Sequence, residues 1–368
     1  MKPQRSSGTS HNVSIAELRL DQYDAILDAR SPGEFADDRL PGARSYPVLD
    51  DEERARVGHL YKQVSPFEAR KLGATLVARN ISKHIETAFA AYGRGWRPLV
   101  YCWRGGKRSA AFTHILREVG WDADVLEGGY RAYRRQVVER LTVLPQSFDF
   151  RVVQGATGSG KSRLLAALQR LGAQVLDLED LAVHRGSVLG NLPGRAQPSQ
   201  KRFESLLLAV LETFDPTRPV YVEGESRKIG QVQVPEKLIE TMRSAACVVL
   251  DAALDVRVAL LLDEYRHFFH DPAALEAQLE HLVPLHGRAV IDDWKLLVRG
   301  ASWRELVSRL LLEHYDPAYQ KSAARNFTLL ANAPWLHIDA ETAAAFDAAA
   351  AQLLRGRFAA CAAQPQTA

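Results

Sequence analysis

The chain has 368 residues, 46% of them hydrophobic and 25% charged, a composition typical of a globular protein long enough to bury two separate cores. Its formal net charge of +3 permits a polyanionic partner without requiring one. Three widely spaced cysteines do not form a disulfide framework, the polar N-terminus lacks the apolar core of a secretion signal, and no apolar run approaches the roughly 18 residues of a membrane span, so we expect a cytoplasmic protein without a membrane partner.

Apolar strands alternate with helical segments over residues 12–142. "YDAILDAR" from Tyr23 and "PLVYC" ending at Cys102 predict buried strands, with a longer mixed stretch between them. "RSAAFTHILREVG", "ADVLEGG" and "YRAYRRQVVERL" then predict a helix, a strand and a basic helix. This succession is typical of a parallel sheet covered by helices, so the first fold unit is α/β.

A second α/β series follows over residues 147–368, and we place the boundary near Pro145. Strand-like runs in this series are "FRVVQG", "AQVLDLED", "PVYVEGE" and "ACVVLDA", and helical segments separate them. Residues 255–315 show helical patterns without a strand signal, before "WLHIDA" at Trp335 predicts another strand. The pattern therefore predicts a sheet domain that carries a helical insertion.

Cys102 ends an apolar strand and precedes a two-glycine turn, after which Arg108 and Ser109 open a helix. The N–H groups of such a turn, the helix dipole and the guanidinium groups of Arg104 and Arg108 would bind an oxyanion and lower the pKa of the Cys102 thiol. We therefore predict that Cys102 is a nucleophile, with Arg104 and Arg108 as its catalytic partners. The alternative is a buried strand-end cysteine without chemistry.

Two chemistries share the spacing of this loop. Five residues separate Cys102 from Arg108 and Ser109 follows, as in cysteine-dependent phosphatases, in which the arginine clamps a phosphate. Tyr101 stands where such phosphatases commonly carry histidine. The surrounding motifs "LDARSPGEF" and "LPGA" resemble those of a rhodanese domain, which implies sulfur or selenium transfer; the residues that carry this resemblance are Asp28, Arg30, Glu34, Phe35 and Leu40. Asp38 departs from the rhodanese pattern, which often has histidine there.

"GATGSGKS" matches the phosphate-binding pattern G-x-x-x-x-G-K-[ST] between an apolar strand and an amphipathic helix, and we call it the P-loop. Its backbone N–H groups would surround a phosphate chain, Lys161 would add a positive charge, and Ser162 could reach a metal or an oxygen. The alternative, a glycine-rich turn that binds nothing, is disfavoured by the strand-loop-helix context. The residues predicted to bind here are Gly155, Thr157, Gly158, Ser159, Gly160, Lys161 and Ser162.

Acidic residues follow two neighbouring strands, where ligands bind in such sheets. The candidates for holding a metal-bound water or orienting a substrate are Asp177, Glu179, Asp180, Glu223 and Glu225. We assign Glu223 and Glu225 to the cofactor site, with helix capping as the alternative role. The insertion bears cations that are candidates for a lid over phosphates or for nucleic-acid contacts, or that simply form a solvated face: Arg257, Arg266, His267, Arg288, Lys295 and Arg299.

A rhodanese-like unit joined to a P-loop unit is an unusual pairing, and further motifs sharpen it. "ERARVGHLYKQ", "VYCWRGGKRSAAF", "LEGGYRAYRR", "QGATGSGKS" and "EGESRKIG" together resemble the tRNA 2-selenouridine synthase family over nearly the whole chain. The resemblance implies that wobble-position 2-thiouridine in tRNA is S-geranylated from geranyl diphosphate, and that selenium from selenophosphate then replaces the geranylated sulfur. It also implies that Cys102 acts in the selenium step and that the P-loop holds a diphosphate, with Mg²⁺ a candidate companion and no requirement for ATP.

Basic and aromatic residues near the thiol motif are candidates for contact with tRNA. Arginines would meet phosphates, and aromatic rings would stack on an extruded base. The candidates are Arg131, Arg134, Arg135 and Trp103, with Tyr130, Tyr133 and Trp294 as further stacking partners. A solvent face or domain interface is the alternative for all of them. Cys247 lies in an apolar strand and Cys361 near the C-terminus, and we predict that both are inert.

Two other functions compete with this interpretation. One is a small-molecule kinase with an appended sulfurtransferase or cysteine-phosphatase domain, because P-loops usually bind nucleoside triphosphates. The other is that the N-terminal unit is only a regulatory binding module, in which Cys102 would titrate as an ordinary thiol. The oligomeric state is not indicated by the sequence.

Overall fold

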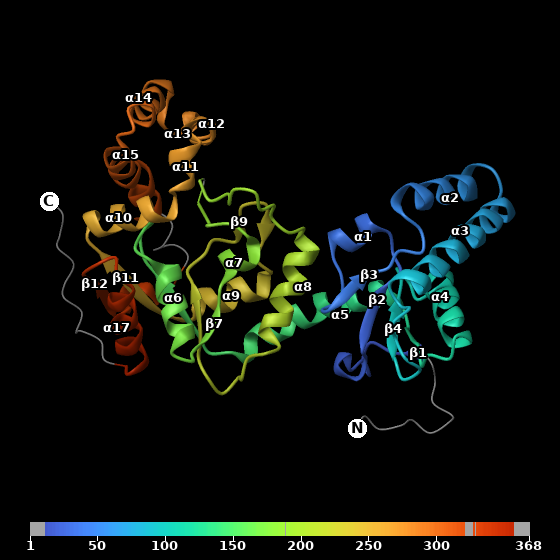
Figure 1. Cartoon of the computed structure of the whole chain (residues 1–368). Coiled ribbons are helices and arrows are strands. Elements are labelled where there is room, and N and C mark those ends of the chain that lie inside the picture. Colours follow the sequence, from blue (N-terminus) through green and yellow to red (C-terminus); the bar gives the residue numbers. More distant parts are fainter. Residues whose placement is uncertain (1–11, 188, 321–326, 328, 357–368) are drawn as a thin grey trace. The chain divides into compact units, whose positions relative to one another are not determined.

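A computed structural model describes residues 12–187, 189–320, 327 and 329–356 of the chain. Two compact units are present, residues 1–140 and 141–368, each with its own sheet (Figure 1). This confirms the predicted α/β class with two parallel sheets. None of the described helices combines the length and apolar character needed to cross a membrane.

The first unit contains a five-stranded sheet in the order β1-β5-β4-β2-β3, and every neighbouring pair is parallel. β4 and β5 are buried along their whole length, and the burial of β4 explains why it appears in the sequence as a short continuous apolar run. The strands are β1 Asn12–Val13, β2 Ala25–Asp28, β3 Ala43–Ser45, β4 Pro98–Tyr101 and β5 Asp124–Leu126.

The helices of this unit begin at well-formed caps. Ser31 and Glu34 form a capping box at α1, and Asp50 and Glu53 form another at α2. Ser65 caps α3, which starts at Pro66 and accounts, together with α2, for the mixed stretch of the sequence. The helices are α1 Pro32–Asp37, α2 Asp51–Gln63, α3 Pro66–Thr87, α4 Lys107–Glu118 and α5 Gly129–Val143, with a short 3-10 helix at Leu20–Gln22.

The second unit contains a parallel five-stranded sheet in the order β12-β11-β6-β8-β7. An antiparallel hairpin of β9 and β10, which the sequence patterns do not predict, follows the "EGES" motif. The strands are β6 Phe150–Gln154, β7 Gln174–Leu176, β8 Val220–Glu223, β9 Lys228–Ile229, β10 Val232–Gln233, β11 Ala246–Ala252 and β12 Trp335–Ile338.

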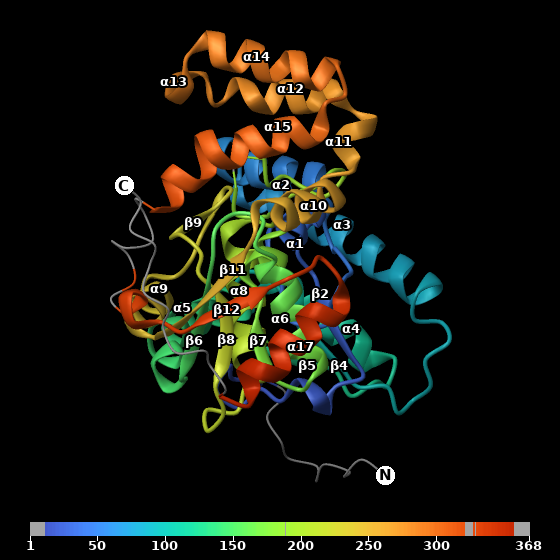
Figure 2. The same ribbon diagram turned by 90° about the vertical axis from the view of Figure 1, so that its left-hand side faces the viewer.

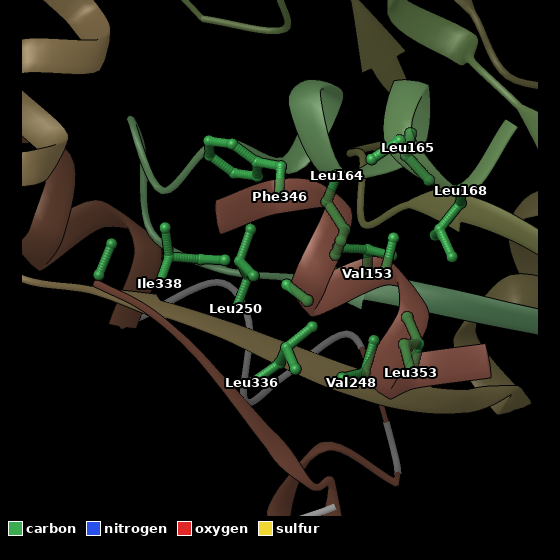
Figure 3. Packing of buried hydrophobic residues seen from close by; sticks show 14 of the residues in the cluster. Val153, Leu164, Leu165, Leu168, Val248, Leu250, Leu336, Ile338, Phe346 and Leu353 are labelled. Atoms are coloured by element: carbon green, nitrogen blue, oxygen red, sulfur yellow. The ribbon is translucent and has the colours of Figure 1, made fainter. Parts of the chain in front are cut away.

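Helices α6 and α17 pack on this sheet through one apolar cluster (Figure 3). Leu164 and Leu168 of α6 and Phe346 and Leu353 of α17 lie against strand residues such as Leu250. This packing holds the start of α6, and with it the P-loop, firmly against the sheet. The sheet-domain helices are α6 Lys161–Arg170, α7 Leu178–Ala182, α8 Gln200–Leu211, α9 Glu236–Ser244 and α17 Ala343–Leu354, with 3-10 helices at Leu144–Ser147 and Leu330–Asn332.

The helical insertion has a core of its own, which includes Leu279, Ile291, Trp294 and Leu306. Figure 2 shows α12, α14 and α15 side by side. A π-helical turn at Leu311–Tyr315 continues α15. The insertion helices are α10 Leu254–Glu264, α11 His267–His270, α12 Pro272–Glu280, α13 Val283–His286, α14 Arg288–Arg299 and α15 Trp303–Leu310.

Most of the insertion's predicted ligand-binding cations instead pair with nearby acids. Arg288 and Lys295 contact Glu280, Arg299 contacts Glu276, and Arg266 contacts Asp263. The pairs of Arg266, Arg288 and Arg299 lie at the surface, where such contacts contribute little stability. These pairs favour the solvated-face interpretation over a phosphate lid.

Trp294 is not available to stack on a base. Its side chain is fully buried in the insertion core, so the prediction that it meets an extruded nucleotide is wrong. The amphipathic pattern of α14 turns this residue toward the other insertion helices.

Candidate functional site: a thiol loop and a phosphate loop

The thiol loop, residues 102–106, joins the end of the buried central strand β4 to the start of α4. α4 begins at Lys107 with Gly106 as its N-cap, so the first N–H groups of the helix lie immediately after the loop. Arg108 and Ser109 occupy the first turn of α4. The structure thus brings Cys102, Arg108 and Ser109 to one end of one strand, as the sequence predicts.

Two consecutive glycines of the "LEGGYR" motif hold the thiol loop in place. A Cβ atom on Gly129, whose φ is +57°, would lie 2.2 Å from the carbonyl oxygen of Cys102. The N–H of Tyr130 donates to that carbonyl at 2.8 Å, and the N–H of Arg131 donates to the carbonyl of Trp103 at 3.0 Å. The start of α5 therefore serves as a template for the backbone of the loop.

Substituting Gly129 by alanine is expected to destabilise the first unit by about 2–4 kcal/mol, because a side chain would be strained at this φ and would overlap the Cys102 carbonyl. Thermal unfolding measures the loss. The matched control is Gly58→Ala, in helix α2, where a Cβ meets nothing within 4 Å and where alanine should be neutral or stabilising. Equal melting temperatures for the two variants would contradict this packing.

Cys102 is only 3% exposed, and burial by itself raises the pKa of its thiol. Hydrogen bonds from the Ser109 side chain and from the N–H groups of Ser109 and Arg104, together with the charge of Arg108, outweigh burial and lower the pKa. The Ser109 hydroxyl lies 3.2 Å from the sulfur and 3.1 Å from the Gly106 carbonyl. The loop is therefore built to stabilise a thiolate.

The two predicted arginine partners differ in their surroundings. Arg108 donates to Glu34 of α1 at 2.8 Å and 3.4 Å, in the fork geometry that would suit an oxyanion. Glu34 is 74 residues away from Arg108 in the sequence. Burial raises the pKa of Glu34, but the charges of Arg108 and Arg54 and the hydrogen bond from Ser31 outweigh burial, so the pKa is lowered. Arg104 is exposed. Sequence reasoning assigned Glu34 to the domain pattern and missed that it positions Arg108.

A buried polar network lies behind the thiol loop. Arg30 pairs with Asp28 at 2.6 Å and donates to the carbonyl of Asp38 at 2.6 Å. Tyr101 donates to Asp28 at 2.6 Å, and Tyr130 donates to the Asp38 carboxylate at 2.9 Å. Asp38, the departure from the rhodanese pattern, is thus a fully buried acceptor for Tyr130. Asp28 and Arg30 of the "LDAR" motif therefore have a structural role in this network and form no hydrogen bond with the thiol.

The candidate tRNA-contacting residues of α5 separate into two groups. Arg131 and Arg135 are exposed, while Arg134 and Trp103 are half-buried, with the Trp103 ring 5.3 Å from that of Tyr130. Tyr130 and Tyr133 are buried, at 1% and 7% exposure, so the prediction that they stack on a base is wrong. Contact with tRNA remains a prediction for Arg131, Arg134, Arg135 and Trp103.

The P-loop joins β6 to α6, as the motif requires. Lys161 donates to the carbonyl of Gly155 at 3.0 Å, so its ammonium group lies across the loop. Gly160, with φ +84°, leaves no room for a Cβ, which would lie 2.4 Å from Phe346. Two side chains at the loop, Gln154 Nε2 and Ser159 Oγ, are buried without a hydrogen-bond partner. Gln154 was missed by sequence reasoning, since a glutamine at the end of an apolar strand carries no motif.

Arg257 of α10 is part of the P-loop's support. It is 8% exposed, donates to the carbonyl of Thr157 at 2.9 Å and pairs with Asp316 at 2.5 Å. The hypothesis that Arg257 belongs to a lid over phosphates is therefore wrong, because its guanidinium group is engaged by the backbone of the loop and by a carboxylate.

The Glu179 carboxylate lies beside Ser162, and those of Glu223 and Glu225 lie near Glu179. The Ser162 hydroxyl donates to Glu179 at 3.1 Å, and the N–H of Glu179 donates to Glu223 at 2.8 Å. Burial, with the nearby charge of Glu225, raises the pKa of Glu179 to about 8. Burial also raises the pKa of Glu223 and of Glu225, although Lys161 opposes the shift at Glu225. One Glu223 oxygen has no hydrogen-bond partner.

The other two predicted acids, Asp177 and Asp180, lie at the start of α7. The Asp177 side chain accepts a hydrogen bond from the N–H of Asp180 at 2.8 Å and caps α7, which is the helix-capping alternative. Across the described ranges of the chain, no group of three or more His, Cys, Asp or Glu side chains is arranged to hold a metal ion.

Two family models match the chain. One, described as a rhodanese-like domain, matches residues 13–136, and the other, described as the tRNA 2-selenouridine synthase AAA domain, matches residues 148–282. A tRNA 2-selenouridine synthase of Shewanella halifaxensis is 33% identical over 84% of this chain and 93% of its own length. The chain belongs to the tRNA 2-selenouridine synthase family. Another synthase of this family, from Alcanivorax borkumensis, is 37% identical over 82% of this chain and 90% of its own.

Several solved structures also match part of the chain. The N-terminal domain of a putative ATP/GTP binding protein from Clostridium difficile 630 is 31% identical, with a TM-score of 0.30, over 34% of this chain and 97% of its own. Membership of the tRNA 2-selenouridine synthase family favours tRNA modification over the kinase alternative. Of the remaining cysteines, Cys247 is buried and burial raises its pKa to about 11, whereas Cys361 lies outside the described residues.

Proposed function

We propose that the chain converts wobble-position 2-thiouridine of tRNA to 2-selenouridine in the cytoplasm, by S-geranylation from geranyl diphosphate followed by selenium transfer from selenophosphate. Family membership supports the overall conversion. The observation that carries the two-step scheme is the presence, in one chain, of a thiolate-stabilising loop and a separate P-loop, because two anionic donors require two anion sites.

In the first step the thiouridine sulfur attacks C1 of the geranyl group at the P-loop. A C–S bond forms, the C–O bond to diphosphate breaks, and the diphosphate leaves with its electron pair. Lys161 and the N–H groups of the loop would neutralise the charge that develops on the leaving diphosphate. Mg²⁺ is a candidate companion of the diphosphate, because it is held through one or two carboxylates together with substrate phosphates rather than by a group of three protein ligands.

S-alkylation also releases a proton from N3 of the base, because C2 becomes doubly bonded to N3 when its bond to sulfur becomes single. A general base must take that proton. Glu179 suits this role, since it lies beside Ser162 at the start of α6 and its pKa is raised to about 8. A base with a pKa near the working pH combines a useful ionised fraction with proton affinity.

Replacing Glu179 by glutamine is expected to slow geranylation by about 10²–10⁴-fold. In the wild type the carboxyl group is protonated below its pKa and becomes a base above it, so the rate should rise with pH and level off above about 8. Single-turnover geranylation measured between pH 6 and 9.5 tests this. If the Glu179→Gln enzyme kept the wild-type rate and the same inflection in its pH profile, another group would have to accept the proton.

The second step replaces sulfur by selenium without any change of oxidation state. Selenium of selenophosphate attacks C2, the C2–S bond breaks, and geranyl thiolate leaves and takes a proton. The nucleobase then carries an Se–P bond, which must break for selenouridine to form. We propose that the Cys102 thiolate attacks this phosphorus, so that the P–Se bond breaks, N3 regains a proton, and water hydrolyses the phosphocysteine to phosphate.

Electron counting favours attack at phosphorus over attack at selenium. Selenium in selenophosphate is already at the selenide level. If Cys102 attacked selenium instead, the product would carry an S–Se bond and the phosphorus would leave as phosphite, unless an oxidant were supplied. The cysteine–arginine–serine spacing supports phosphoryl transfer, with the Ser109 hydroxyl 3.2 Å from the sulfur and with Arg108, which pairs with Glu34, adding its positive charge near the thiol.

A staged reconstitution tests the whole scheme. Purified protein, 2-thiouridine tRNA and geranyl diphosphate should yield only S-geranylated nucleoside, and later addition of selenophosphate should yield selenouridine, geranyl thiol and phosphate in equal amounts. Nucleoside mass spectrometry and ³¹P NMR follow the products. Selenouridine formed without geranyl diphosphate, or phosphite in place of phosphate, would overturn the scheme.

A further inference from the structure

The insertion and the P-loop enclose an apolar cavity that no step above uses. Its walls come from α10, α11, α12, α15, the π-helical turn and Leu189, and they include Leu262, Phe269, Val307 and Leu310. Thr157 of the P-loop forms one wall. Leucine and aromatic side chains make up most of the lining, whereas Thr157, Tyr265 and Tyr315 supply its hydroxyl groups.

The cavity shares a wall with the P-loop. A Cβ on Gly158, next to Thr157, would lie 2.8 Å from Cδ1 of Leu261, a cavity-lining residue, so the loop backbone packs directly on the cavity wall. A ligand with a diphosphate on the P-loop would therefore have its other end next to apolar side chains that line the cavity. Burying an apolar chain there is favourable by about 0.8 kcal/mol per CH₂.

We propose that this cavity binds the hydrocarbon chain of a prenyl diphosphate whose diphosphate occupies the P-loop. This inference rests on the proposed function, and it places the geranyl donor at the P-loop rather than at the thiol loop. The lining argues against a nucleoside as occupant, because a base and ribose need several polar partners and few are present.

The cavity must widen to take a ten-carbon chain. Its volume is about 50 Å³, whereas an apolar cavity of about 150 Å³ is needed for benzene alone. Two features allow widening. Phe269 and Trp303, stacked at 4.8 Å, are only half-buried, and the wall includes the π-helical turn at Leu311–Tyr315, a geometry that is often found at functional sites.

Binding of a chain-length series by isothermal titration calorimetry tests the inference. The probes are inorganic diphosphate, dimethylallyl diphosphate and geranyl diphosphate. For the wild type we expect affinity to rise along the series, by about 100-fold or more from inorganic to geranyl diphosphate. Leu310→Ala, which enlarges the cavity, should preserve this rise and improve binding of the longer farnesyl diphosphate.

Val307→Trp, which fills the cavity, should reduce the preference for geranyl over inorganic diphosphate to less than about threefold while inorganic diphosphate binds as before. Glu305→Trp is the matched control, since Glu305 is exposed on the same helix and does not line the cavity. Circular dichroism and melting temperature verify that both variants fold.

The possible failures are distinguishable. An unchanged geranyl preference in Val307→Trp overturns the cavity assignment and leaves the P-loop's diphosphate role intact. If inorganic diphosphate does not bind at all, or if Lys161→Ala leaves geranyl diphosphate affinity unchanged, the proposed function of the P-loop fails and the cavity assignment fails with it.

Discussion

Cys102→Ser protein is expected to form selenouridine about a thousandfold more slowly than the wild type, or not at all, and to accumulate the Se-phosphorylated nucleoside, because the thiol acts after geranyl thiolate has left. The hydroxyl of serine is a far weaker nucleophile than the thiolate that the loop stabilises. Geranylation should continue at the wild-type rate, because the P-loop belongs to the other unit. Nucleoside mass spectrometry after incubation with both donors separates the two products.

The matched control is Cys247→Ser. Cys247 is buried in β11, and burial raises its pKa to about 11, so its loss should affect neither step. Selenouridine made at the normal rate by Cys102→Ser would remove the thiol from the mechanism.

Lys161→Ala is expected to weaken binding of geranyl diphosphate by about 10–150-fold, since it removes a charged donor worth about 1.5–3 kcal/mol to a diphosphate. Geranylation should fall at least as much, because the same charge would stabilise the leaving group. Titration calorimetry and single-turnover rates measure the two effects.

Lys237→Ala serves as the control for this variant. Lys237 is an exposed lysine of the same unit that pairs with Glu240 in helix α9. Its removal should change neither affinity nor rate. If both variants bound geranyl diphosphate equally well, the P-loop lysine would have no part in holding the donor.

Local patterns correctly predicted the strand-loop-helix geometry of the thiol loop and the P-loop, because each depends on residues adjacent in sequence. Cys102, Arg108 and Ser109 are fixed by one strand, one turn and one helix, and the P-loop is fixed in the same way. The partners that position these residues come from far away in the chain. Glu34 reaches Arg108 across 74 residues, and no local periodicity reports such a contact.

Aromatic residues and cations on helices were the weakest part of the sequence interpretation. Tyr130 and Tyr133 lie on a basic helix and Trp294 on an amphipathic one, so each pattern is compatible with either a stacking surface or a buried face. The structure buries all three. Arg257 was misassigned for a related reason, because a buried arginine that supports a backbone carbonyl looks, in sequence, the same as a surface cation.

The contact of Arg257 with Thr157 and Asp316 separates the insertion into a fixed base and freer outer helices. Separating α10 from the P-loop would leave a buried guanidinium group and a backbone carbonyl without their partners at the same time, which would be strongly destabilising. α12 to α14 have no such anchor to the P-loop among the described residues, and they pack mainly on one another and on α15. Shortening or exchanging those outer helices should therefore be tolerated far better than altering the root of the insertion.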